Sequence, residues 1–147
     1  MDFVLNSVQR SLLAILQDAT RSKILKVLAD YSVHPEVLVE ETGVSRTAIE
    51  KHLKQLLNYG ILERRAQTYP RLRYVYSLTS EAEVLLDLIS SATEQFSDGV
   101  KEKWEDELSQ IEQGYVFGAL QKEEFEKIKQ DFVSRLNCLT PEREEDE

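Results

Sequence analysis

The stretch PEVLVEETGVSRTAIEKHLKQLLNY, residues 35–59, contains the signals of two helices separated by a short turn. Pro35 suits the first turn of a helix, where its missing N–H costs little. Gly43 suits the left-handed residue that ends a helix, and Ser45 suits the N-cap of the next one. The apolar residues of the second helix recur on one face, at Ile49, Leu53, Leu56 and Leu57. We therefore predict a helix-turn-helix whose second helix runs from about Arg46 to Tyr59.

The flanking sequence predicts two helices before this motif and a hairpin after it. Apolar residues at three- and four-residue steps indicate a helix near 3–16, and residues 18–20 indicate a break and an N-cap before a helix ending near Ala29. The runs 61–65 and 73–78 are typical of strands and surround a loop that contains Thr68 and Pro70. Three helices, the one ending near Ala29 and the two of the motif, are thus followed by a hairpin. This order is typical of a winged helix-turn-helix.

Helical spacing of apolar residues also extends from residue 85 to residue 115, after an N-cap at Thr79 or Ser80. The Ser-Asp-Gly triplet at 97–99 predicts a break or kink in this run. Gly114 and Gly118 then bracket a predicted loop.

The rest of the chain predicts a last helix over 123–139 and a charged tail. We expect a mainly α-helical fold with a small β-hairpin wing and a C-terminal helical extension that is compatible with a coiled coil. The expected organisation is a winged helix-turn-helix DNA-binding domain at 1–80, a helical dimerisation region at 81–140 and an acidic tail at 141–147.

Composition indicates a soluble protein with a single core. Of the 147 residues, 41% are apolar and 31% are charged, which is typical of neither a disordered nor a membrane protein. No apolar run approaches the ~20 residues that a membrane span needs, and no basic segment precedes an apolar one at the N-terminus. We expect a cytoplasmic protein with no membrane partner. The single cysteine, Cys138, excludes an intramolecular disulfide and every multi-cysteine zinc motif.

The net charge of −9 hides an asymmetry between the two parts of the chain. Residues 1–80 carry a net charge of +3, whereas residues 81–147 carry −12. Within 43–76 there are seven basic residues and only two acidic ones. This local basic patch on an acidic protein favours a nucleic-acid surface next to a separate acidic module. The alternative is that the basic residues within 43–76 form an ordinary solvated surface that binds no partner.

Residues on the polar face of the second helix of the motif have the chemistry of base and phosphate recognition. Arg46 suits guanine O6 and N7, Glu50 suits cytosine N4, and Thr47 suits a thymine methyl group or a phosphate. The lysines of this helix and the arginines of the hairpin suit phosphates, and the hairpin also suits the minor groove. The predicted DNA-binding residues are Ser45, Arg46, Thr47, Glu50, Lys51, His52, Lys54, Arg64, Arg65, Arg71 and Arg73.

Several of these segments resemble a known family, the ArsR-type winged-helix regulators. DATRSKILKVL (18–28) is similar to their D-P-T-R-x-x-I-L-x-x-L helix, and GVSRTAIEKHLKQL (43–56) is similar to their recognition helix, including the His-Leu-Lys pattern. YGILERR (59–65) and YVYSLT (74–79) resemble the wing strands. The resemblance covers about residues 12–90 and implies a dimeric transcription regulator of bacterial or archaeal type, most often a repressor that binds double-stranded DNA.

The sequence departs from the metal-sensing members of that family. They place paired cysteines on the helix before the turn, but here the corresponding stretch, HPEVLVE (34–40), has none. His34 and His52 have no histidine or cysteine at helical spacing, so we predict no metal site, and nothing indicates a cofactor. Ala19 replaces the proline of the family pattern.

The apolar stripe after residue 81 has an acidic outer face and needs a partner to cover it. We expect a homodimer interface on this stripe, with packing onto its own domain as the alternative. The predicted interface residues are Leu85, Leu88, Ala92, Phe96, Val100, Trp104 and Leu108.

No Gly-rich phosphate loop, His-Glu-x-x-His or Gly-x-Ser-x-Gly motif is present, so an enzyme is not expected. The sequence therefore predicts a sequence-specific DNA-binding regulator, and it does not identify an effector. The alternative is a winged-helix adaptor that binds protein and not DNA.

Overall fold

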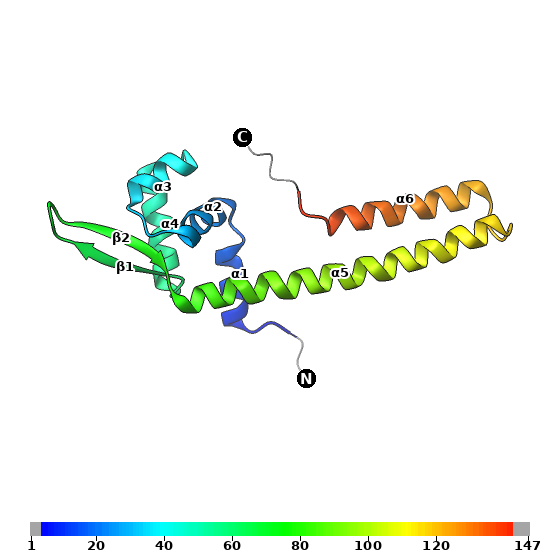
Figure 1. Cartoon of the computed structure of the whole chain (residues 1–147), viewed down its shortest axis with the longest axis horizontal. Coiled ribbons are helices and arrows are strands. Elements are labelled where there is room, and N and C mark those ends of the chain that lie inside the picture. Colours follow the sequence, from blue (N-terminus) through cyan, green and yellow to red (C-terminus); the bar gives the residue numbers. More distant parts are fainter. Residues whose placement is uncertain (1–3, 143–147) are drawn as a thin grey trace. The chain divides into compact units, whose positions relative to one another are not determined.

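The computed structural model describes residues 4–142, and Figure 1 shows the order of their helices and strands. The elements are α1 (Ser7–Leu16), α2 (Ala19–Asp30), α3 (Pro35–Thr42), α4 (Arg46–Asn58), β1 (Leu62–Gln67), β2 (Arg73–Leu78), α5 (Ser80–Val116) and α6 (Lys122–Cys138). The predicted mainly α-helical fold with a two-stranded wing is confirmed. Of the predicted acidic tail, residues 143–147 lie outside the part of the chain that the structure describes.

The chain divides into two compact units, the first ending at Asp87 and the second beginning at Leu88. The division lies inside α5 because the start of this helix packs on the first unit, where Ala82 is buried and Leu86 contacts the core. The predicted boundary between functional domains at residue 80 stays a prediction.

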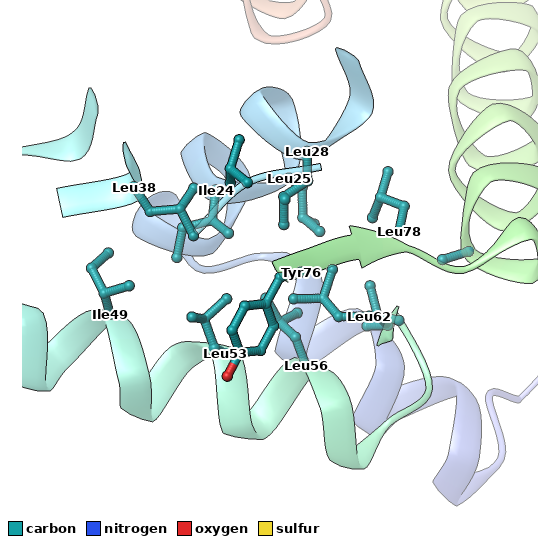
Figure 2. Packing of buried hydrophobic residues seen from close by; sticks show 13 residues of the cluster. Ile24, Leu25, Leu28, Leu38, Ile49, Leu53, Leu56, Leu62, Tyr76 and Leu78 are labelled. Carbon is teal, nitrogen blue, oxygen red and sulfur yellow. The ribbon is translucent and has the colours of Figure 1, made fainter. Parts of the chain in front are cut away.

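The helix-turn-helix forms through the caps that the sequence predicts. α3 begins at Pro35 and ends at Gly43, whose φ of +68° is the left-handed conformation that glycine adopts without strain. Ser45 Oγ accepts a hydrogen bond from the backbone N–H of Ala48 at 3.3 Å, which caps α4. The apolar faces of α2, α3 and α4 meet in the core shown in Figure 2, with Ile24, Leu38, Ile49, Leu53 and Leu56 almost completely buried.

The wing is an antiparallel hairpin in which Leu62 pairs with Leu78 and Gln67 pairs with Arg73. Its base is part of the core, because Leu62, Tyr76 and Leu78 are buried. Val33 and Tyr76 exchange two backbone hydrogen bonds of 3.1 and 2.9 Å, which fix the segment before α3 to β2. In the outer half of the hairpin, β1 is exposed, whereas Arg73 and Val75 of β2 are half-buried. The fold thus places the wing beside the helix-turn-helix within the first unit.

The predicted helix near 3–16 starts later than expected. α1 begins at Ser7, where Asn6 and Gln9 form a reciprocal capping box with hydrogen bonds of 2.8 and 2.9 Å. These two polar caps satisfy the first N–H groups and fix the start of the helix. Phe3, the first apolar residue of the predicted stripe, lies outside the described residues.

The predicted break at residues 97–99 is wrong, because α5 runs without interruption from Ser80 to Val116. A glycine inside a helix costs only about 1 kcal/mol, and Gly99 takes a negative φ here. The predicted loop is also shorter than expected, since Gly114 lies within α5. The helix ends at Val116, and the turn after it contains Gly118, with φ +80°, where Ala119 N–H donates to Gly114 O at 2.8 Å.

In the second unit, α6 packs against the C-terminal half of α5 to form a helical hairpin (Figure 1). The rings of Tyr115 and Phe125 stack with centroids 4.5 Å apart, and the Arg135 guanidinium lies 6.0 Å from the Trp104 ring. Phe125 and Phe132 are the buried apolar residues of α6. Within residues 4–142, no helix combines the length and the apolar character that crossing a bilayer requires.

Candidate nucleic-acid interface

α4 separates a buried apolar face from an exposed polar one. Ile49, Leu53 and Leu56 point into the core and orient the helix. The exposed face carries five of the predicted DNA-binding residues: Arg46, Thr47, Glu50, Lys51 and Lys54. Ser45 caps the N-terminal end of this face. In a helix-turn-helix this end of the second helix is the part that contacts base edges.

Arg46, the first residue of α4, is held by two carboxylates. Its Nη1 lies 2.8 Å from Glu36 Oε1 on α3, and its Nε lies 3.0 Å from Glu50 Oε1 one turn further along α4. These hydrogen bonds, first to Glu50 and then to Glu36, raise the pKa of the guanidinium. The pKa of Glu36 is lowered, first by a hydrogen bond with its own backbone and then by Arg46. The pair with Glu50 joins residues four apart on one helix, whereas Glu36 comes from another helix.

His52 lies on the side of α4 that faces α2. Its Nδ1 accepts a hydrogen bond from Arg21 Nε at 3.1 Å, and Arg21 Nη1 donates to Ile15 O at 2.9 Å. The histidine thus connects the predicted recognition helix to α2 and to the end of α1. Its predicted phosphate contact stays a prediction, and no local sequence signal pointed to Arg21.

The wing presents its arginines on two faces. Arg64 lies over the Tyr74 ring, 4.2 Å from its centroid, and hydrogen bonding with Tyr76 raises the pKa of this guanidinium. Arg73 Nε donates to Gln67 Oε1 at 3.2 Å. Arg65 follows Arg64 in β1, so its side chain projects from the opposite face of the hairpin.

A cleft of about 780 Å³ lies between the helix-turn-helix and the wing. Basic residues from both elements line it: Arg46, Lys54, Arg64, Arg71 and Arg73. Two carboxylates, of Glu36 and Glu50, and the rings of Tyr74 and Tyr76 complete the polar and aromatic parts of its wall. The fold therefore brings together basic residues of α4 and of the wing that are separated by up to 27 positions in the sequence. Arg65, Lys51 and His52 lie outside the cleft.

The predicted dimer-interface residues on α5 differ in their exposure. Leu88 and Phe96 are 62% and 64% exposed, and Ala92 between them is also exposed. Leu85, Val100, Trp104 and Leu108 are half-buried, and Trp104 has its intramolecular neighbour on α6. The stripe as a dimer interface stays a prediction.

No group of three or more His, Cys, Asp or Glu side chains within residues 4–142 could hold a metal ion. His34 instead donates a hydrogen bond from Nδ1 to Tyr74 O at 3.2 Å, which connects α3 to the wing. Cys138 is an exposed free thiol.

Fold and site together define a winged helix-turn-helix protein with a basic cleft between the helix-turn-helix and the wing. Residues 18–64, which are 47 of the 147, match the family model described as "Bacterial regulatory protein, arsR family". The resemblance to ArsR-type regulators is therefore confirmed for the segment from the N-cap of α2 into β1.

Solved structures support the same fold. Diamide-treated YodB from B. subtilis is 20% identical, with a TM-score of 0.58 over 65% of this chain and 95% of its own. The homodimeric winged helix-turn-helix DNA-binding domain of Mb0332 from Mycobacterium bovis is 19% identical, with a TM-score of 0.53 over 65% of this chain and 93% of its own. HlyU from Vibrio cholerae is 22% identical, with a TM-score of 0.50 over 58% of this chain and 91% of its own. A search of curated protein sequences found no match.

Proposed function

We propose that this protein is a sequence-specific regulator of transcription that binds double-stranded DNA as a homodimer and represses its targets. The observation that carries the proposal is the basic cleft between α4 and the wing. Its five cations come from the two elements that a winged helix applies to DNA, and the exposed start of α4 carries side chains suited to base edges.

In this proposal α4 enters the major groove, where Arg46 donates to guanine O6 and N7. Glu50 accepts from cytosine N4, and Thr47 contacts a thymine methyl group or a phosphate. Lys51 and Lys54 bind phosphates, and the wing arginines follow the adjacent backbone or the minor groove. The negative charge of residues 81–147 repels DNA, which leaves the first unit as the attractive surface.

Exposed apolar side chains support the dimer. Leu88 and Phe96 on α5 are mostly exposed, and α1 has no buried residue although Val8 and Leu13 lie on it. Such faces are typical of surfaces that a partner covers. A two-fold dimer presents two recognition helices to major grooves about one helical turn apart, and a repressor of this kind excludes other proteins from the site it covers.

The test is fluorescence anisotropy with random genomic duplexes at about 50 and 200 mM salt, for the wild type and an Arg46→Ala/Lys54→Ala variant. We expect binding that weakens by orders of magnitude at the higher salt and is largely lost in the variant. Lys103→Ala/Lys127→Ala, which removes two exposed positive charges from the second unit, is the matched control and should lose far less affinity than the Arg46→Ala/Lys54→Ala variant, because its lysines lie outside the basic cleft.

If the folded wild type does not bind DNA at low salt, the proposed regulator function is contradicted. The winged helix would then serve as a protein-binding adaptor, which a stoichiometric protein partner in a pulldown would support.

A further inference from the structure

Arg46 is paired with more negative charge than it carries, at the point where the proposed function needs a donor to DNA. Glu36 and Glu50 each place a carboxylate oxygen within 3.0 Å of its guanidinium, so the three side chains together carry a net charge of −1. Both pairs are about half-exposed, so they contribute little to the stability of the fold.

The two carboxylates leave most of the guanidinium able to donate. Arginine has five N–H donors, and the bonds to Glu36 and Glu50 use one on Nη1 and the one on Nε. The second N–H of Nη1 and both on Nη2 remain for a ligand. Both terminal nitrogens of the guanidinium therefore keep a donor for the paired acceptors O6 and N7 of guanine.

The same carboxylates discriminate between the two kinds of acceptor that DNA offers. Guanine O6 and N7 are neutral, so an arginine held between carboxylates still binds them. A phosphate is an anion, and its approach to this guanidinium meets the repulsion of two negative charges a few ångströms away. An unpaired arginine at this position would bind phosphates of any sequence.

Glu36 is the partner whose role the recognition helix itself does not explain. It lies on α3, ten residues before Arg46, and its carboxylate ties the two helices of the motif together at the rim of the basic cleft. Glu50 lies on the proposed DNA surface and has its own base partner there, cytosine N4, whereas Glu36 acts through Arg46.

We propose that Glu36 is a specificity-determining positioning residue, which holds Arg46 for neutral base-edge acceptors and opposes its binding to phosphate. This inference rests on the proposed function. Loss of the Glu36 charge should therefore strengthen binding to DNA of any sequence and weaken the preference for the selected sequence.

The experiment compares Glu36→Gln with the wild type on two probes, a random-sequence duplex pool and a duplex selected from it by the wild type. Binding is followed by anisotropy across a salt series. We expect Glu36→Gln to bind the random pool more tightly, with a salt slope steeper by about one for each protomer, because Arg46 gains a phosphate contact. The ratio of affinities for the selected and random duplexes should fall at least about fivefold, the lower end of what one bidentate base contact supplies.

Glu40→Gln is the matched control. Glu40 lies one turn further along α3, is exposed, and forms no ion pair among the described residues, so its replacement removes the same charge without releasing Arg46. We expect it to change both affinities by the same factor. Melting temperatures within a few degrees of the wild type establish that both variants fold.

Each outcome decides a different claim. A Glu36→Gln variant whose specificity ratio and salt slope match those of Glu40→Gln overturns the role of Glu36 and leaves the proposed function in place. A wild type that binds neither probe overturns the proposed function, and this inference with it.

Discussion

Single side chains set the ends of the helices that carry the candidate interface. Gly43 ends α3 at φ +68°, and nothing lies within 4 Å of where a Cβ would be built on it. Ser45 then caps α4, and Asp18 caps α2 through a 2.9 Å hydrogen bond from the backbone N–H of Arg21. Because Gly43 and Ser45 fix where α4 begins, they also fix the position of Arg46.

Gly43→Ala tests the turn of the helix-turn-helix. The left-handed conformation costs a residue with a Cβ about 1–2 kcal/mol, and no clash adds to it here. We expect the variant to lower the melting temperature followed by circular dichroism. Gly99→Ala is the control, since this glycine lies inside α5 with open space around it and alanine favours the helix. It should raise the stability, and two shifts of the same sign would contradict the account.

Asp18 makes the stability of the first unit depend on pH. The hydrogen bond from Arg21 N–H, with the Arg21 charge, holds the pKa of this carboxyl below its ordinary 3.8. Because folding lowers this pKa, the ionised cap stabilises the fold above the unfolded-state value, and the effect is lost as the pH falls through the lowered one.

The measurement is urea unfolding of the wild type and of Asp18→Asn between about pH 6 and pH 2.5. We expect the wild type to be the more stable protein at pH 6 and the difference to close toward the acid end. A difference that stays constant over this range would show that the carboxylate charge has no role at the cap.

At the scale of elements, α4 and the wing form one basic surface from two different kinds of structure. α4 contributes Arg46 and Lys54, and the hairpin contributes Arg64, Arg71 and Arg73. A helix in the major groove reads base edges, whereas arginines on a wing contact the DNA backbone. Replacing the α4 residues should therefore change the sequence preference, and replacing the wing arginines should change the affinity for any sequence.

Arg71→Ala/Arg73→Ala should weaken binding by a similar factor for selected and random duplexes and reduce the salt slope by about two for each protomer. Arg46→Ala should instead cost about 1–3 kcal/mol on the selected duplex and relax the sequence preference. Arg65→Ala is the internal comparison, because the Arg65 side chain projects from the opposite face of the hairpin and lies outside the cleft. We expect it to lower the affinity for DNA less than the Arg71→Ala/Arg73→Ala variant does. Equal changes in specificity for the wing and Arg46 variants, measured by anisotropy, would contradict this division of roles.

Local signals in the sequence predicted the elements well and the contacts between them poorly. Gly43 and Ser45 fix their helix ends through their own backbone and side chain, so the pattern predicts them correctly. The break expected at 97–99 is wrong because the preference of a single glycine is small against the propagation of a long helix. The pairs Glu36–Arg46 and Arg21–His52 join residues of different helices, and only the packed fold brings them together.

At the scale of the whole molecule, the two units differ in charge and in the surfaces they expose. The first carries the basic cleft, and the second is an acidic helical hairpin whose part of α5 exposes Leu88 and Phe96. A regulator that reads two half-sites needs two copies of the first unit, and this apolar stripe is the surface we propose for pairing them.

Leu88→Glu/Phe96→Glu tests that pairing. We expect the wild type to sediment at about 34 kDa, twice the 17.0 kDa of one chain, and the variant at about 17 kDa, because buried carboxylates without partners oppose association. Ser90→Glu, which adds a carboxylate at an exposed position elsewhere on α5, should leave the mass unchanged. A wild type that sediments as a monomer at concentrations where it binds DNA would contradict the homodimer.

The most direct test of α4 as a major-groove reader is methylation interference on a duplex selected by the wild type. Methylation of guanine N7 marks the major groove, and methylation of adenine N3 marks the minor groove. We predict that N7 methylation blocks binding at two positions one helical turn, about 10 base pairs, apart, and that Arg46→Ala removes this interference. Binding that tolerates N7 methylation throughout the duplex would contradict the placement of α4 in the major groove.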